Sequence, residues 1–201
     1  MNTNLLKNRS LRTFVLLLFA LSIPLWILGS IYDVQIFPGF NLYQLPLGMP
    51  AVAALILIVR EDGKRGVIAL LQRTYDVRNV KAKIWFLPIL LIYPSIGLLD
   101  YLLQRMAGAT MPGPHFSLPI LLGYSTVFLM TFGEELGLTG YAIDPLQQRY
   151  SALMTGILLG LVWVGYHIPA FVISGYYSFW WIFWHALYTI AGRVLFVWVY
   201  N

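Results

Sequence analysis

Long apolar runs separated by short polar connections dominate this 201-residue chain. The hydrocarbon core of a bilayer is about 30 Å thick, and a helix needs about 20 consecutive apolar residues to cross it. Runs near this length predict helices over 13–32, 42–59, 84–104, 118–143, 152–173 and 179–200. The pattern therefore predicts an all-α fold, a polytopic transmembrane helix bundle of about six helices.

The same pattern predicts a simple domain organisation. Residues 1–12 form a short N-terminal segment, and 13–201 form a single transmembrane domain without a soluble module. A basic connection occupies 60–83, and the helices that carry unusual polar residues lie within 118–173.

Composition supports a membrane protein and excludes most soluble classes. Hydrophobic residues make up 59% of the chain and charged residues only 10%, whereas soluble domains have roughly 25% charged residues. The absence of cysteine rules out thiolate ligands and cysteine nucleophiles. The net charge of +5 does not indicate nucleic-acid binding, because the basic residues are spread between apolar runs instead of forming one patch.

The basic residues predict an orientation. All but two of the thirteen Lys and Arg residues fall before the first span, in 60–83 or in the connection at 144–151. Cytoplasmic flanks are enriched in Lys and Arg, so we expect a multi-pass protein of the plasma membrane with a cytoplasmic N-terminus. Arg193 lies inside the last span, where snorkelling to the cytoplasmic side is the favoured interpretation and pairing with a carboxylate is the alternative.

Glu134 and Glu135 stand together within an apolar run. A charge near the centre of a span costs about 2.5–3.5 kcal/mol, so such residues usually face a cavity or a partner. Successive helical residues point about 100° apart, which indicates distinct roles for the two carboxylates. A structural alternative places the pair at the cytosolic rim of a shorter helix.

His167 lies among apolar residues of the following span, two positions before Pro169. In a hairpin that turns between 145 and 151, His167 and Glu134 differ in depth by only about 8 Å at 1.5 Å per residue. Two carboxylates and an imidazole around one polar pocket suit the activation of a water against a carbonyl, with or without a metal. A structural hydrogen-bonding histidine is the alternative.

These residues resemble two motifs of the CPBP intramembrane endopeptidases, the family of type II CAAX prenyl proteases and bacteriocin-immunity membrane proteins. The first motif, EExxxR followed by Gly-Tyr, is similar to 134–141, with Thr139 at the arginine position. The second has an aromatic residue, three intervening residues and a histidine, as Trp163 and His167 do here. The resemblance covers roughly residues 45–201.

The resemblance implies hydrolysis of a peptide bond in a membrane-embedded site. Glu134 would be the general base for a water, Glu135 would orient the site, and His167 would polarise the carbonyl or stabilise the oxyanion. No cofactor is required by this scheme, although zinc bound by Glu134, Glu135 and His167 is possible. The expected partners are membrane lipid and a peptide or prenylated-protein substrate.

The family's third motif, a histidine followed four residues later by Asn or Asp, lies on a later span, so the chain is expected to be a truncated form or a fragment. His185 is a possible substitute, with Thr189 at the last position of the motif. A non-catalytic relative that confers bacteriocin immunity or stabilises a partner is the main alternative function. A small proton-coupled transporter that uses the glutamates and His167 as a relay is the second.

Overall fold

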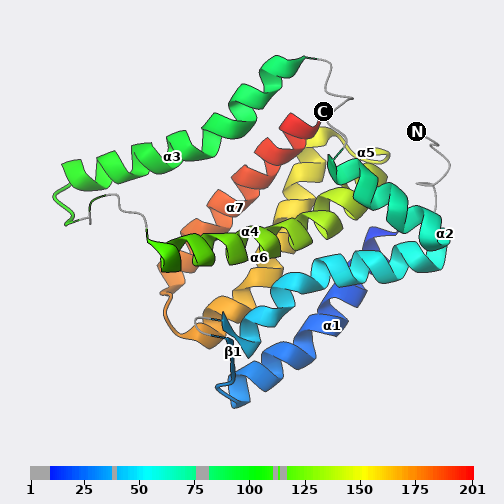
Figure 1. Ribbon diagram of the computed structural model, residues 1–201, viewed down its shortest axis with the longest axis horizontal. Helices are drawn as coiled ribbons and strands as arrows, with labels where there is room; N and C mark the ends of the chain where they lie inside the picture. Colours follow the sequence, from blue (N-terminus) through cyan, green and yellow to red (C-terminus); the bar gives the residue numbers. More distant parts are fainter. Residues whose placement is uncertain (1–9, 38–39, 76–81, 111–112, 114–116) are drawn as a thin grey trace. The chain divides into compact units, whose positions relative to one another are not determined.

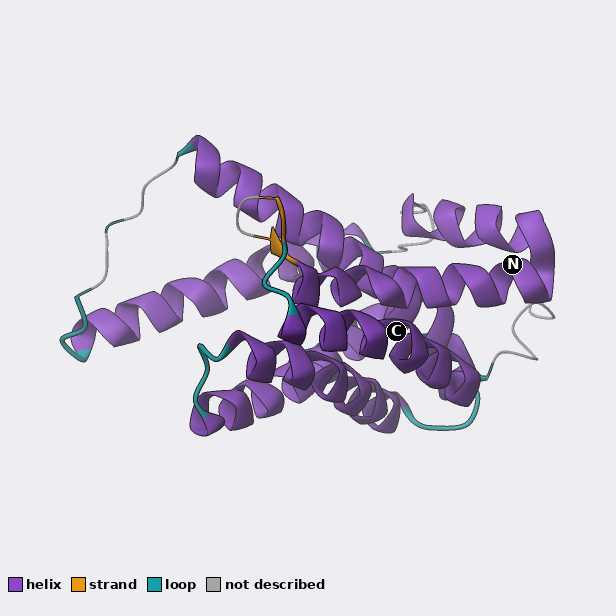
Figure 2. Cartoon of the chain, turned by 90° about the horizontal axis from the view of Figure 1, so that it is seen from below, coloured by secondary structure: helices purple, strands orange, loops and turns teal. Residues whose placement is uncertain are grey.

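The computed structural model describes residues 10–37, 40–75, 82–110, 113 and 117–201. Helices and short turns account for nearly all of this part of the chain (Figures 1 and 2). The α-helices are α1 (Leu11–Ile31), α2 (Met49–Tyr75), α3 (Phe86–Met106), α4 (Leu118–Gly137), α5 (Ile143–Gln147), α6 (Ala152–Ser174) and α7 (Phe179–Tyr200). The predicted all-α fold is confirmed.

Shorter elements connect these helices. Two 3-10 segments, η2 (Leu42–Gly48) and η4 (Lys83–Trp85), precede α2 and α3, and a π-helical segment, η5 (Leu138–Ala142), follows α4. The strands β1 (Gln35–Phe37) and β2 (Phe40–Asn41) form a small antiparallel pair after α1.

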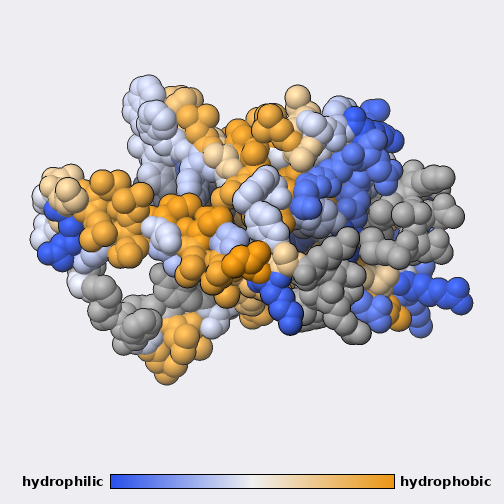
Figure 3. Space-filling model, turned by 90° about the horizontal axis from the view of Figure 1, so that it is seen from above, coloured by the Kyte–Doolittle hydropathy of each residue, from blue (hydrophilic) through white to orange (hydrophobic). Residues whose placement is uncertain are grey.

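Five helical stretches in the described part of the chain are long and apolar enough to cross a membrane. They are Leu11–Ile31, Leu42–Thr74, Lys83–Met106, Ala152–Ser174 and Phe179–Tyr200. The sixth predicted span, 118–143, consists of α4, η5 and the start of α5, and α4 carries two carboxylates in its last turn. Exposed side chains on the long helices are largely apolar, and Figure 3 shows wide hydrophobic areas on the face in view. The chain is a multi-pass membrane protein.

Side-chain caps define where several helices begin. The hydroxyls of Ser10, Ser151 and Ser178 accept hydrogen bonds from the backbone N–H groups of Thr13, Met154 and Trp181 at 3.2–3.3 Å. A serine at this position satisfies an N–H group that has no partner within the helix. These caps explain why the starts of α1, α6 and α7 lie within two residues of the bounds predicted from hydrophobicity.

The basic connection predicted over 60–83 is helical up to Tyr75, because α2 continues past the end of its apolar run. The helix breaks at Gly63, whose φ of 63° is strained for any residue with a side chain. Beyond the break, Leu70 is buried in the core while Ile68 and Leu71 are exposed. Residues 76–81 lie outside the described residues, so the end of this connection remains a prediction.

The described residues pack as two compact units, which we treat separately. The larger contains the residues up to Tyr75 together with Val127–Asn201, and the smaller lies within 76–126. In the smaller unit, Gln104 donates to the carboxylate of Asp100 at 2.8 Å within α3. All the candidate site residues belong to the larger unit.

Helices α6 and α7 form the most closely packed helix pair of the larger unit and lie side by side in Figure 1. Two glycines of α6 make this approach possible. A Cβ at Gly156 would lie 2.7 Å from Cα of Val194, and one at Gly160 would lie 2.9 Å from Cα of Ile190. Small residues that let helix backbones meet are a common basis of packing within membranes.

We predict that Gly156→Val lowers the free energy of unfolding by about 1–3 kcal/mol, the usual cost of overpacking. The added side chain would collide with the α7 backbone at Val194, so the two helices would have to separate. Thermal unfolding of the detergent-purified protein measures the effect. Gly165→Ala in the same helix is the control, because its Cβ would meet only Phe19, at 4.0 Å. Equal midpoints for the two variants would contradict the close approach.

Candidate functional site

The candidate site lies where the end of α4 and the π segment η5 meet α6 and α7. Glu134 and Glu135 occupy the last turn of α4, directly before η5. A π segment widens the helix by one residue and is frequent at functional positions. Thr139 lies on this widened turn, on the same side as Glu135, whose carboxylate it contacts.

Glu134 is buried, with 4% of its surface exposed, and it is held by α6. The indole Nε1 of Trp163 donates a hydrogen bond to Oε2 of Glu134 at 2.9 Å. The other carboxylate oxygen, Oε1, lies 3.6 Å from Nε2 of His167. The structure thus brings Glu134 and His167 together across the α4–α6 turn, as their calculated depths suggested.

The imidazole of His167 is oriented by its own helix. Its Nδ1 lies 2.9 Å from the carbonyl oxygen of Trp163. Because a carbonyl only accepts hydrogen bonds, this contact assigns the proton to Nδ1. The ring also packs edge-on against Trp163 and Tyr166, with centroids 5.0 and 5.4 Å apart. Nε2 is therefore the ring nitrogen that faces Glu134.

Glu135 has entirely different partners. Arg193 of α7 donates from Nη2 to Oε1 of Glu135 at 2.7 Å and from Nη1 to Oε2 at 2.9 Å. Thr139 also donates to Oε2, and its hydroxyl accepts from Nη1 of Arg193 at 3.3 Å. Both oxygens of Glu135 are thus engaged by a fork-shaped ion pair, one of the strongest polar contacts available to a carboxylate.

The snorkelling interpretation of Arg193 is wrong. The side chain is 1% exposed and stays among the helices instead of extending to a membrane surface. Its guanidinium also lies over the ring of Trp163, with Cζ 4.9 Å from the centroid. The alternative, pairing with a carboxylate, describes its position.

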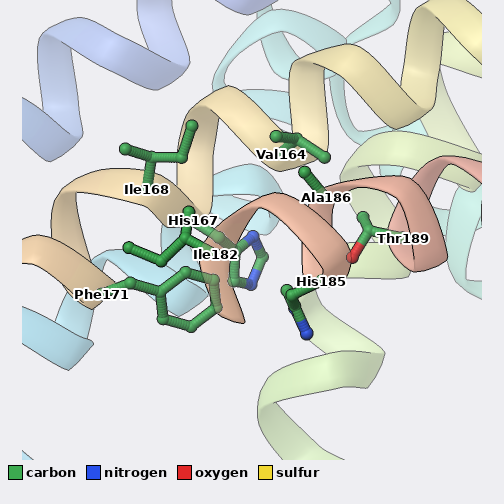
Figure 4. Close-up of a pocket in the computed structure, with 8 residues that line it drawn as sticks. All are labelled: Val164, His167, Ile168, Phe171, Ile182, His185, Ala186 and Thr189. Atoms are coloured by element: carbon green, nitrogen blue, oxygen red, sulfur yellow. The ribbon is translucent and has the colours of Figure 1, made fainter. Parts of the chain in front are cut away.

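His185 shares a small cleft with His167, between α6 and α7 (Figure 4). The cleft is small and open to its surroundings, and it is otherwise lined by Thr189 and the apolar residues Val164, Ile168, Phe171, Ile182 and Ala186. The His185 ring stacks on Trp181 at 4.6 Å and packs edge-on against Phe171 at 5.0 Å. The two histidines therefore border one space, while the role of His185 stays a prediction.

The donor set does not fit a zinc site built from Glu134, Glu135 and His167. Catalytic zinc ordinarily has three protein ligands. Here both oxygens of Glu135 are bound to Arg193, which leaves only Glu134 and His167 facing each other. Among the described residues, no three His, Cys, Asp or Glu side chains are grouped to hold a metal ion.

Comparison with known proteins finds a similarity to a curated protease. No family model matches the chain. Its sequence is 28% identical over 181 residues to CAAX prenyl protease 2 of Methanococcus maripaludis, covering 84% of this chain. This similarity supports an assignment to the CPBP, or type II CAAX prenyl protease, family. It spans 65% of the length of that relative.

The sequence did not decide which residue is the partner of Glu135. Thr139 stands where the family motif has an arginine, and that substitution was the signal that another cation had to be found. Arg193 was the one basic residue predicted inside a span, 54 residues beyond Thr139. Only the packing of α7 against η5 shows that Arg193 and Thr139 meet.

We predict stability effects of different size for the two isosteric substitutions. Glu135→Gln is expected to lower the free energy of unfolding by about 3 kcal/mol, because it leaves the buried Arg193 without a counter-charge. Glu134→Gln is expected to change it by less than about 1 kcal/mol, because an amide oxygen still accepts from Trp163. Chemical denaturation in detergent compares the two. A larger loss for Glu134→Gln would contradict this assignment of partners.

Proposed function

We propose that the chain is an intramembrane endopeptidase that hydrolyses a peptide bond with a water activated by Glu134. The observation that carries this proposal is the arrangement of Glu134, a carboxylate 4% exposed, held by Trp163 and facing Nε2 of His167 at 3.6 Å. A base and a second proton-handling group at this separation can both contact one water or one substrate oxygen.

In the proposed reaction, Oε1 of Glu134 takes a proton from the water as its oxygen attacks the scissile carbonyl carbon. The C–N bond then breaks, and Glu134 passes that proton to the departing amine. Nε2 of His167, when it carries a proton, donates to the oxyanion, while Nδ1 remains bonded to the carbonyl of Trp163. Glu135 takes no proton in this scheme, because Arg193 and Thr139 already occupy both of its oxygens.

The family relationship supports a prenylated substrate. The relative from Methanococcus maripaludis is a CAAX prenyl protease, and CAAX sequences are C-terminal motifs whose cysteine carries a prenyl chain. We propose a prenylated or otherwise apolar peptide for this chain as well, delivered from the lipid phase. We propose a plasma-membrane location with a cytoplasmic N-terminus, and the basic residues of α2 support this orientation.

Glu134→Gln is expected to lower kcat for cleavage of a farnesylated CAAX peptide by about 1,000-fold, the scale of a lost general base. The assay follows release of the C-terminal tripeptide by protein reconstituted in vesicles. Asp33→Asn, in the exposed connection after α1, is the control and is expected to cleave normally.

Undiminished cleavage by Glu134→Gln would contradict the role of this carboxylate. If the wild-type protein cleaves no peptide but protects cells from a bacteriocin, the non-catalytic function replaces the proposed one. Glutamate-dependent proton uptake into vesicles would instead support the transporter.

We also propose that no metal is obligatory. Because both oxygens of Glu135 are bound to Arg193, a zinc ion would find only two of the three candidate ligands available. Incubation with EDTA or 1,10-phenanthroline is expected to leave the cleavage rate within twofold of the untreated value. Loss of cleavage that returns on addition of zinc would contradict this proposal.

A further inference from the structure

Arg193 is among the largest completely buried side chains of the described residues. An arginine in the interior of a membrane domain is costly, and it persists where a carboxylate and further acceptors satisfy it. Glu135 accepts from both Nη groups, and Thr139 accepts from Nη1. The guanidinium is therefore fixed at one place and in one orientation.

Arg193 also contacts the group that holds the other glutamate. Its Cζ lies 4.9 Å from the centre of the Trp163 ring, within the range of a cation–π interaction. Trp163 in turn donates its indole N–H to Glu134. One residue of α7 therefore contacts Glu135 directly and Glu134 through Trp163.

The two Arg193 contacts differ in what they constrain. The fork fixes the carboxylate plane of Glu135, because two parallel N–H···O bonds permit one orientation. The contact with the ring limits the tilt of the Trp163 indole and hence the direction of the N–H bond that reaches Glu134. Lysine could supply the charge but neither the fork nor the planar stacking.

We propose that Arg193 is a positioning residue for the glutamate pair, and that it supplies from α7 the guanidinium that the family motif places at position 139. The inference rests on the proposed peptidase function. The geometry permits the relocation, because Thr139 Oγ1 already contacts both Glu135 and Nη1 of Arg193. An arginine at 139 would be four residues from Glu135 on the same helical face, within reach of its carboxylate.

The test moves the guanidinium back to position 139. Arg193→Met is expected to lower kcat about 100-fold with little change in KM, because about 1 Å of misplacement at the reacting groups costs this much. The double variant Thr139→Arg/Arg193→Met is expected to recover kcat to within about tenfold of wild type. Cleavage of the farnesylated peptide in vesicles gives both constants.

Two further variants separate positioning from folding. Arg73→Met breaks another ion pair of the larger unit, to Asp144 of α5, and is expected to lower the thermal midpoint without lowering kcat. Glu135→Gln/Arg193→Met removes both charges of the site pair, so it is expected to unfold near the wild-type midpoint while kcat stays about 100-fold low. This variant keeps the test valid if Arg193→Met alone does not fold.

The outcomes are distinct. Recovery of kcat in the double variant supports the relocation. Normal kcat in Glu135→Gln/Arg193→Met, or no recovery on adding Thr139→Arg to a folded Arg193→Met protein, overturns it and leaves the proposed function intact. Absence of cleavage by the wild-type protein overturns the proposed function, and the positioning role falls with it.

Discussion

A charge inside a membrane domain must find its counter-charge among the helices, and in this protein the ion pair of Glu135 and Arg193 meets that requirement. The pair joins the end of α4 to the middle of α7 through two hydrogen bonds of 2.7 and 2.9 Å. Since either partner alone would be strongly unfavourable, the ion pair favours the register of the two helices in which Glu135 and Arg193 meet. The positions of Thr139 and Trp163, which both contact Arg193, depend on this register.

The ion pair also explains how two adjacent glutamates acquire different chemistry. Glu135 is bound by the guanidinium of Arg193, which occupies both of its oxygens. Glu134 has a neutral indole donor and an imidazole as partners, so one of its oxygens can exchange a proton with a ligand. The 100° step between neighbouring helical residues produces this division, because it directs one carboxylate toward α7 and the other toward α6.

Much of this arrangement could be predicted from local sequence. The lengths of the apolar runs predicted where the helices lie. Counting residues from the turn predicted that Glu134 and His167 lie at similar depths. Both predictions depend only on the regular rise of a helix. The partner of Arg193 could not be predicted in this way. The sequence favoured snorkelling for a basic residue inside an apolar run, whereas the actual outcome depends on how close α7 comes to α4 and η5. The π segment and the continuation of α2 to Tyr75 likewise depend on tertiary packing.

A sequence motif describes one way of bringing the required side chains together in space. Glu135, next to the proposed base Glu134, requires a guanidinium as its partner. The nearest position for that arginine in the sequence is four residues along the same helix, where side chains of adjacent turns meet. At this position the chain has Thr139, which carries no charge. Its hydroxyl is nevertheless well placed to bond both Glu135 and an arginine from another helix. The close approach of α7 to α6 at Gly156 and Gly160 brings that arginine within range. Loss of a motif residue can therefore leave the electrostatic environment intact, provided that another helix supplies the same charge at the same point in space.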